Sequence, residues 1–78
     1  MTNEKFLKIM QGWQRRLLRE GKHPRLSITV FEDSEIMVTA WDGEKFCTET
    51  ACPPGDVLEH HNEQNAKRIE QFLTDKIK

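Results

Sequence analysis

The feature that most constrains the fold is a change of hydrophobic period at Leu26. From there to Thr50 apolar and polar residues alternate, and the strongest members of the alternation lie at even positions: Leu26, Ile28, Val30, Ile36, Val38 and Ala40. Successive side chains of a β-strand point to opposite faces, so a period of two is typical of strands with one buried face. The segment therefore predicts β-structure in the middle of the chain.

Two turn signals divide this segment into three strands. Glu32-Asp33-Ser34-Glu35 supplies the first turn, and Asp42-Gly43 supplies the second, because Gly43 can adopt a positive φ at little cost. Consecutive strands joined by short turns pair antiparallel. We therefore expect a three-stranded antiparallel meander.

The lengths of the turns decide which residues share a face. Paired residues lie on the same face, so odd loops are needed to bring the even positions of all three strands together. A three-residue loop Trp41-Asp42-Gly43 would pair Val38 with Phe46 and Ile36 with Thr48. The predicted inner face is Leu26, Ile28, Val30, Ile36, Val38, Ala40, Phe46 and Thr48.

A helix is predicted on the amino-terminal side of the strands, over about residues 3–20. Thr2 or Asn3 can cap its start, Gly21 can end it in the left-handed conformation, and Pro24 prevents its resumption. Its apolar stripe has the helical spacing i, i+4, i+7 and i+11. The stripe consists of Phe6, Met10, Trp13 and Leu17.

A second helix is predicted after the strands, from about residue 57 to residue 76. Pro53-Pro54-Gly55 breaks the chain, and Asp56 followed by Glu59 resembles a capping box. The predicted inner stripe is Leu58, Asn62, Asn65, Ala66, Ile69, Phe72, Leu73 and Lys76 or Ile77.

These elements predict an α+β fold in the order helix-strand-strand-strand-helix, a two-layer sandwich whose meander is covered on one face by both helices. We expect one domain over residues 1–78, because a typical domain has about 100–150 residues. A core this small argues against a deep enclosed active site.

The other face of the sheet is expected to stay open. It would carry Ser27, Thr29, Phe31, Met37, Thr39, Lys45, Cys47 and Glu49, with Trp41 at its rim. Any protein surface carries scattered apolar residues, but aromatic residues and methionine are also enriched in interfaces. We expect a partner, either another protein or a second copy in a homodimer, to contact Phe31, Met37, Trp41, Thr29, Thr39 and Cys47.

Charge is unevenly distributed along the chain. Residues 1–25 carry a net charge of +5 and residues 26–59 a net charge of −7. Cations near a helix carboxyl end are stabilised by the helix dipole, which is one explanation of the basic segment. The alternative is a phosphate, nucleic-acid or acidic-protein contact through Arg15, Arg16, Arg19, Lys22 and Arg25.

The residues that carry chemistry do not form a recognisable catalytic or metal-binding pattern. Cys47 and Cys52 are separated by four residues, and together with His60 and His61 they match no standard zinc spacing. No nucleophile can be paired with a base, although His60, His61 and Glu63 are titratable. We expect free thiols, no metal or cofactor, no enzyme activity and no small-molecule substrate.

The sequence also has no apolar segment typical of a membrane span or a signal peptide. No apolar run approaches the roughly 18 residues of a membrane span, and the first residues lack the apolar stretch of a signal peptide. We expect a cytoplasmic protein without a membrane partner.

The predicted order of elements resembles that of double-stranded RNA-binding domains. The run Asn65-Ala66-Lys67-Arg68-Ile69 is similar to the second helix of that family. The family grips phosphates with lysines at the start of this helix, whereas this chain has Asp56, Glu59 and Glu63 there. These carboxylates would repel a phosphate backbone, so RNA binding in that mode is not expected.

The compact, highly charged style of the chain is also similar to that of small accessory proteins of phages and mobile elements, including inhibitors of host complexes. The leading hypothesis from the sequence is a non-enzymatic interaction module, an adaptor, regulator or inhibitor, that binds through its open sheet face. The alternative is a nucleic-acid-binding module that uses the basic end of the first helix.

Overall fold

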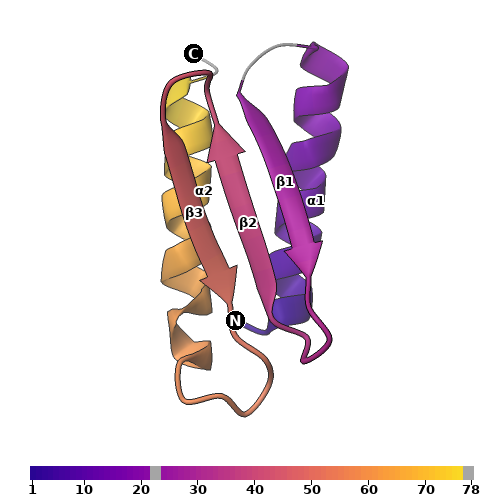
Figure 1. Ribbon diagram of the computed structural model, residues 1–78, viewed down its shortest axis with the longest axis vertical. Helices are drawn as coiled ribbons and strands as arrows, with labels where there is room; N and C mark the ends of the chain where they lie inside the picture. The colour runs from indigo at the N-terminus through magenta and orange to yellow at the C-terminus, as the bar shows by residue number, and fades with distance from the viewer. Residues whose placement is uncertain (22–23, 77–78) are drawn as a thin grey trace.

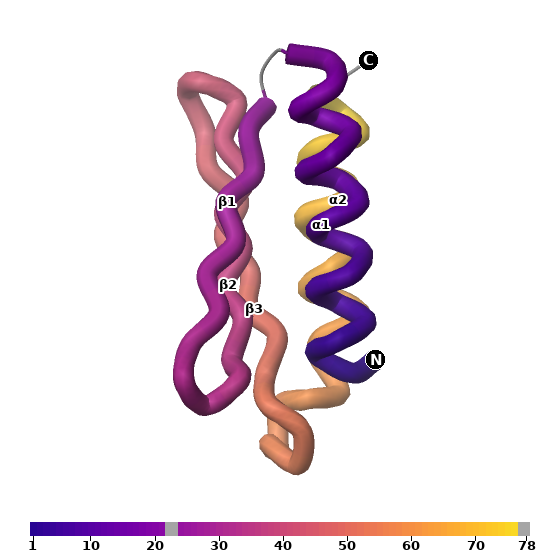
Figure 2. The backbone as a smooth tube through the Cα atoms, turned by 90° about the vertical axis from the view of Figure 1, so that its right-hand side faces the viewer, coloured from indigo at the N-terminus to yellow at the C-terminus, as the bar shows by residue number. Residues whose placement is uncertain are grey.

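The computed structural model describes residues 1–21 and 24–76 and has the predicted α+β architecture (Figure 1). Its elements are α1 (Asn3–Glu20), β1 (Arg25–Val30), β2 (Ile36–Trp41), β3 (Phe46–Ala51), a 3₁₀ turn η1 (Glu59–His61) and α2 (Asn62–Lys76). The strands form one antiparallel sheet in the order β1-β2-β3. Both helices lie on the same side of this sheet (Figure 2), which confirms the two-layer arrangement.

Helix α1 begins and ends where the sequence predicts. The Thr2 hydroxyl accepts a hydrogen bond from the Lys5 N–H at 3.2 Å, and Gly21 has a φ of 66° with its N–H bonded to the Leu17 carbonyl. These contacts satisfy backbone groups that a helix leaves unpaired at its ends. Glycine adopts this left-handed conformation without the steric cost of a Cβ.

The pairing of β1 with β2 also agrees with the alternation. Leu26 lies opposite Ala40, Ile28 opposite Val38 and Val30 opposite Ile36. The even positions of both strands therefore face the helices. Val38 and Ala40 are fully buried there.

The predicted pairing of β3 is wrong. Trp41 is the last residue of β2 and lies opposite Phe46, so Val38 pairs with Glu49 and not with Phe46. The connection has four residues, 42–45, and an even loop moves the odd positions of β3 to the helix side. The predicted inner residues Phe46 and Thr48 therefore lie on the outer face.

Hydrogen bonds of Asp42 explain why the turn begins one residue later than predicted. Its side-chain Oδ1 accepts from the N–H of Glu44 at 2.8 Å and from the N–H of Lys45 at 2.7 Å. Gly43 has a φ of 102°, and Glu44 is not among the residues with positive φ, a combination typical of a type II′ turn. The turn thus begins at Asp42 and leaves Trp41 in the strand.

The core lies between the helix layer and the inner face of the sheet. It is continuous from α1 to α2, which explains why a small chain can keep one face of its sheet uncovered. Its buried members are Phe6, Met10, Leu17, Ile36, Val38, Ala40, Ala51, Ala66, Ile69 and Leu73.

Helix α2 begins later than predicted, at Asn62. The Asp56 and Glu59 side chains do accept backbone hydrogen bonds, from the N–H of Leu58 and of Gly55, but they stabilise the turn that precedes the helix. The fully buried Asn62 exchanges hydrogen bonds with the N–H and carbonyl of Cys52. The end of β3 is thereby tied to the start of α2.

Candidate functional site

The sheet face that points away from the helices is the candidate contact surface. It is built from the odd positions of β1 and β2 and the even positions of β3. Phe31 continues this series, because its N–H donates to the Glu35 carbonyl at 2.8 Å and so extends the ladder beyond β1. We call this surface the contact face; its residues are Arg25, Ser27, Thr29, Phe31, Met37, Thr39, Trp41, Phe46, Thr48 and Thr50.

An aromatic pair occupies one end of the contact face. Trp41 and Phe46 lie directly opposite each other, and their rings stack with centroids 6.5 Å apart and an interplanar angle of 19°. Phe46 is 70% exposed and Trp41 is 37% exposed. Each ring limits the rotamers of the other, so the pair presents apolar area at a reduced entropic cost for a binding event.

The middle of the contact face is neutral and rich in hydroxyl groups. Ser27, Thr39 and Thr48 form one row across the three strands, and the Oγ1 atoms of Thr39 and Thr48 are 3.1 Å apart. The one charged residue among the ten of the face is Arg25, which lies opposite Trp41 at one end, so the middle of the face carries no charge. Depletion of charge is characteristic of the central part of protein interfaces, because desolvating an ionised group is costly.

Two further apolar residues lie toward the other end of the contact face. Met37 is half-buried and pairs with Thr29 in β1 and with Thr50 in β3. Phe31 is exposed in the loop that follows β1. Five of the six residues predicted to bind a partner, all except Cys47, are therefore brought to one face.

Cys47 is a correction to the predicted site. It lies opposite Ala40 on the helix side of the sheet, with its Sγ 3.9 Å from the Arg68 carbonyl of α2. Burial is the main cause that raises the pKa of the Cys47 thiol, and it also raises the pKa of Cys52. Both cysteines are free, and neither points to the contact face.

Phe46 is the aromatic contact-face residue that sequence reasoning missed, together with Thr48 and Thr50 of the same strand. Its position depends on where the turn between β2 and β3 begins. The hydrophobic alternation favoured a loop that ends with Asp42-Gly43, whereas in the structure Asp42 is the first residue of the turn. The overlooked signal is the side chain of Asp42, because aspartate at the first position of a turn bonds backbone N–H groups two and three residues later.

The structure does not gather the predicted basic residues into one surface. Arg16 contacts Glu20 at 3.4 Å and lies over the Trp13 ring at 5.0 Å, on the side of α1 that faces α2. Arg15 and Arg25 instead line a groove on the other side of α1. Arg19 is exposed in the last helical turn, and Lys22 lies outside the described residues.

Within residues 1–21 and 24–76 no three or more His, Cys, Asp or Glu side chains lie close enough together to hold a metal ion. The His60 and His61 rings lie 4.0 Å apart in η1. None of the helices in the same ranges has the length and apolar character needed to cross a membrane.

Comparisons with protein-family models, with curated proteins and with solved structures give no match for this chain.

Proposed function

We propose that this chain is a non-enzymatic protein-interaction module, an adaptor, regulator or inhibitor, that binds a protein partner through the contact face. The observation that carries the proposal is the stacked Trp41–Phe46 pair on the sheet face that points away from both helices (Figure 2), beside a middle row of hydroxyl groups without charge. A partner that covers this pair would gain about 1.5–3 kcal/mol for each large apolar side chain that becomes fully buried.

The arrangement of the face favours a flat partner surface rather than a small ligand. Three paired strands form the face, and its apolar residues lie at both ends of a hydroxyl-bearing centre. Small-molecule sites are concave and enclose most of their ligand. Protein interfaces instead combine apolar anchors with hydroxyl and backbone hydrogen bonds over a broad area.

The proposal is tested by replacing both aromatic residues in a tagged protein. We expect Trp41→Ser with Phe46→Ser to reduce partner recovery from nuclease-treated extracts of the source cells by roughly tenfold or more, as loss of a central anchor does. Far-UV circular dichroism checks that the fold is retained. Sedimentation velocity of the pure protein then shows whether a second copy is the partner.

Val57→Ser is the matched control, because Val57 is also an exposed large apolar residue but lies in the segment between β3 and η1. Its recovery of the partner should equal that of the unaltered protein. Equal recovery by the double aromatic variant would refute binding through the contact face.

A further inference from the structure

The outer edge of β1 provides a second surface, independent of the contact face. The N–H of Phe31 bonds the Glu35 carbonyl, and bonded positions alternate along an antiparallel ladder. The odd residues of β1 therefore direct their backbone groups toward β2. Leu26, Ile28 and Val30 direct theirs outward, away from the sheet.

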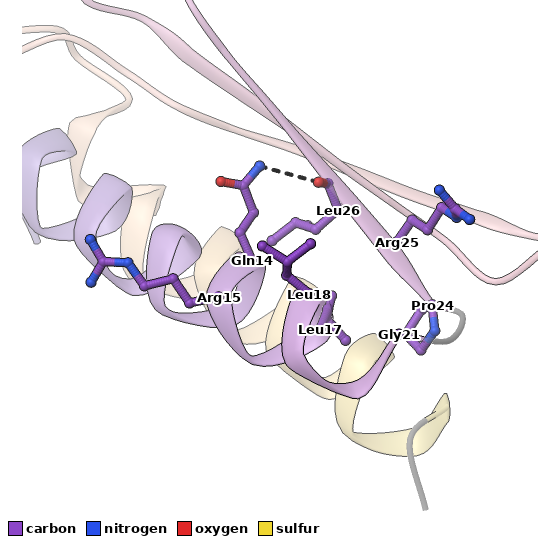
Figure 3. A pocket seen from close by; sticks show the side chains of 8 residues that line it. All are labelled: Gln14, Arg15, Leu17, Leu18, Gly21, Pro24, Arg25 and Leu26. Atoms are coloured by element: carbon purple, nitrogen blue, oxygen red, sulfur yellow. Dashed lines mark hydrogen bonds between the residues drawn. The ribbon is translucent and has the colours of Figure 1, made fainter.

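One of these outward groups, the Leu26 carbonyl, already accepts a hydrogen bond. The Gln14 amide of α1 bonds the Leu26 carbonyl at 3.2 Å, as Figure 3 shows. Among the described residues no other side-chain hydrogen bond reaches the backbone of β1. The outward N–H and carbonyl groups of Ile28 and Val30 are consequently available to an added strand.

An apolar groove runs beside this edge. Near the start of β1 it has a volume of about 600 Å³ and is lined by Leu17, Leu18, Pro24 and Leu26. Leu18, which lines this groove from α1, is 83% exposed. A second hollow of about 350 Å³ lies at the other end of β1, between Leu7 and Val30.

The spacing of the two hollows matches an extended peptide. Leu26 and Val30 are four residues apart, or about 14 Å along a strand. A strand added to β1 would project alternate side chains toward α1, and two of them, four positions apart, would enter the two hollows. The side chain between them would lie beside Ile28.

Charges at the two ends determine which flanks complement a peptide that adds antiparallel to β1. Arg15 and Arg25 line the hollow at the start of β1, where Figure 3 shows their guanidinium groups on opposite sides of the groove. Glu4 lines the hollow at the end of β1. Antiparallel addition places the carboxyl-terminal half of the peptide at the arginines and its amino-terminal half at Glu4.

We propose that the groove between α1 and the edge of β1 binds an extended peptide by strand addition, one with apolar residues at three alternate positions, a basic amino-terminal flank and an acidic carboxyl-terminal flank. Backbone hydrogen bonds would supply affinity, and the hollows and end charges would supply selectivity. The peptide would become a fourth strand of the sheet.

The test starts from a phage-displayed library of random dodecapeptides panned on the folded protein. Enriched sequences are expected to contain three alternating apolar residues followed by Asp or Glu. In ¹⁵N spectra a synthetic enriched peptide should shift the amides of Ile28 and Val30 most. Methylation of the peptide nitrogen that faces Ile28 should weaken binding about tenfold or more, because one backbone donor is lost.

Two variants and one control separate this groove from the contact face. Leu18→Asp should lower the affinity about tenfold or more, and Arg15→Glu, in α1 and away from the contact face, should remove the preference for an acidic flank. Phe46→Ser should bind the peptide as the unaltered protein does. The proposal is overturned if no peptide is enriched, or if binding survives Leu18→Asp and is lost in Phe46→Ser, which would instead support the contact face.

Discussion

Ser34 holds a backbone conformation that its side chain disfavours. It is the one described non-glycine residue with positive φ, at 71°, and its N–H bonds the Phe31 carbonyl to close the turn between β1 and β2. The Asn3 amide also donates to the Ser34 carbonyl at 2.6 Å. The turn therefore keeps the first turn of α1 in contact with the sheet, despite a local steric cost.

Ser34→Gly should stabilise the protein. The left-handed conformation costs a non-glycine residue about 1–2 kcal/mol, and glycine removes this cost. The greater freedom of glycine in the unfolded chain offsets about 0.5–1 kcal/mol of the stabilisation. We expect a net increase of roughly 0.5–1 kcal/mol in the free energy of unfolding, measured by urea titration. A decrease would show that the Ser34 side chain contributes more than its backbone conformation costs.

At the scale of elements, the turn between β2 and β3 decides which side chains reach the contact face. Asp42 fixes that turn through two backbone N–H groups, and its Oδ2 lies 2.9 Å from the Lys76 ammonium of α2. The N–H groups of Lys45 and Glu44, followed by Lys76, hold the pKa of Asp42 well below its usual range.

Because the pKa of Asp42 is lower in the folded state, its ionised form stabilises the fold. This contribution is complete above the unfolded-state pKa of about 4 and is lost as the pH falls from there toward the folded-state value. Asp42→Asn keeps the acceptor oxygen but removes the charge. Urea unfolding should show the unaltered protein more stable than Asp42→Asn at pH 7, with the difference shrinking below about pH 4; a pH-independent difference would contradict this account.

The same turn shows what the sequence could and could not predict. The helical spacing of Phe6 to Leu17, the cap at Thr2 and the alternation from Leu26 to Ala40 follow from local periodicity and conformational preference, and these predictions are confirmed. The register of β3 is different, because Phe46, Thr48, Cys47 and Glu49 give no clear apolar alternation. Only the turn geometry at Asp42 settled which of them face the helices.

The start of α2 was mispredicted for a related reason. Acidic residues that bond nearby backbone N–H groups favour a 3₁₀ turn as well as the first turn of an α-helix. Asp56 and Glu59 make such bonds in the turn, while the α-helix begins where the buried Asn62 bonds Cys52. That long-range contact has no signature in the local sequence.

At the scale of the whole molecule, the dipoles of the two helices are parallel. Both helices run in the same direction along the longest dimension, which measures 36 Å (Figure 1). Their amino ends share one end of the molecule with the acidic turn that contains Glu32 and Asp33. Acidic groups there, and Arg19 at the opposite end, complement the parallel helix dipoles. Asp42 and Glu44 lie at the end with the helix carboxyl termini, where Asp42 contacts Lys76, so the dipoles account for only part of the charge asymmetry.

The placement of both helices on one side also creates the contact face. Met37, Thr39 and Trp41 followed from the alternation of β2, so most of the candidate site could be found from sequence. Its aromatic pair could not, because pairing Trp41 with Phe46 depends on the turn between their strands. The edge groove likewise requires α1 and β1 to be placed in space.

Site-directed photo-crosslinking tests the central claim most directly. A benzophenone analogue of phenylalanine placed at Phe46, and in a second protein at the exposed Gln64 of α2, reports which face meets another chain in the source cells. The account predicts protein adducts from position 46 and none from position 64. Adducts from position 64 with none from position 46 would contradict the assignment of the contact face.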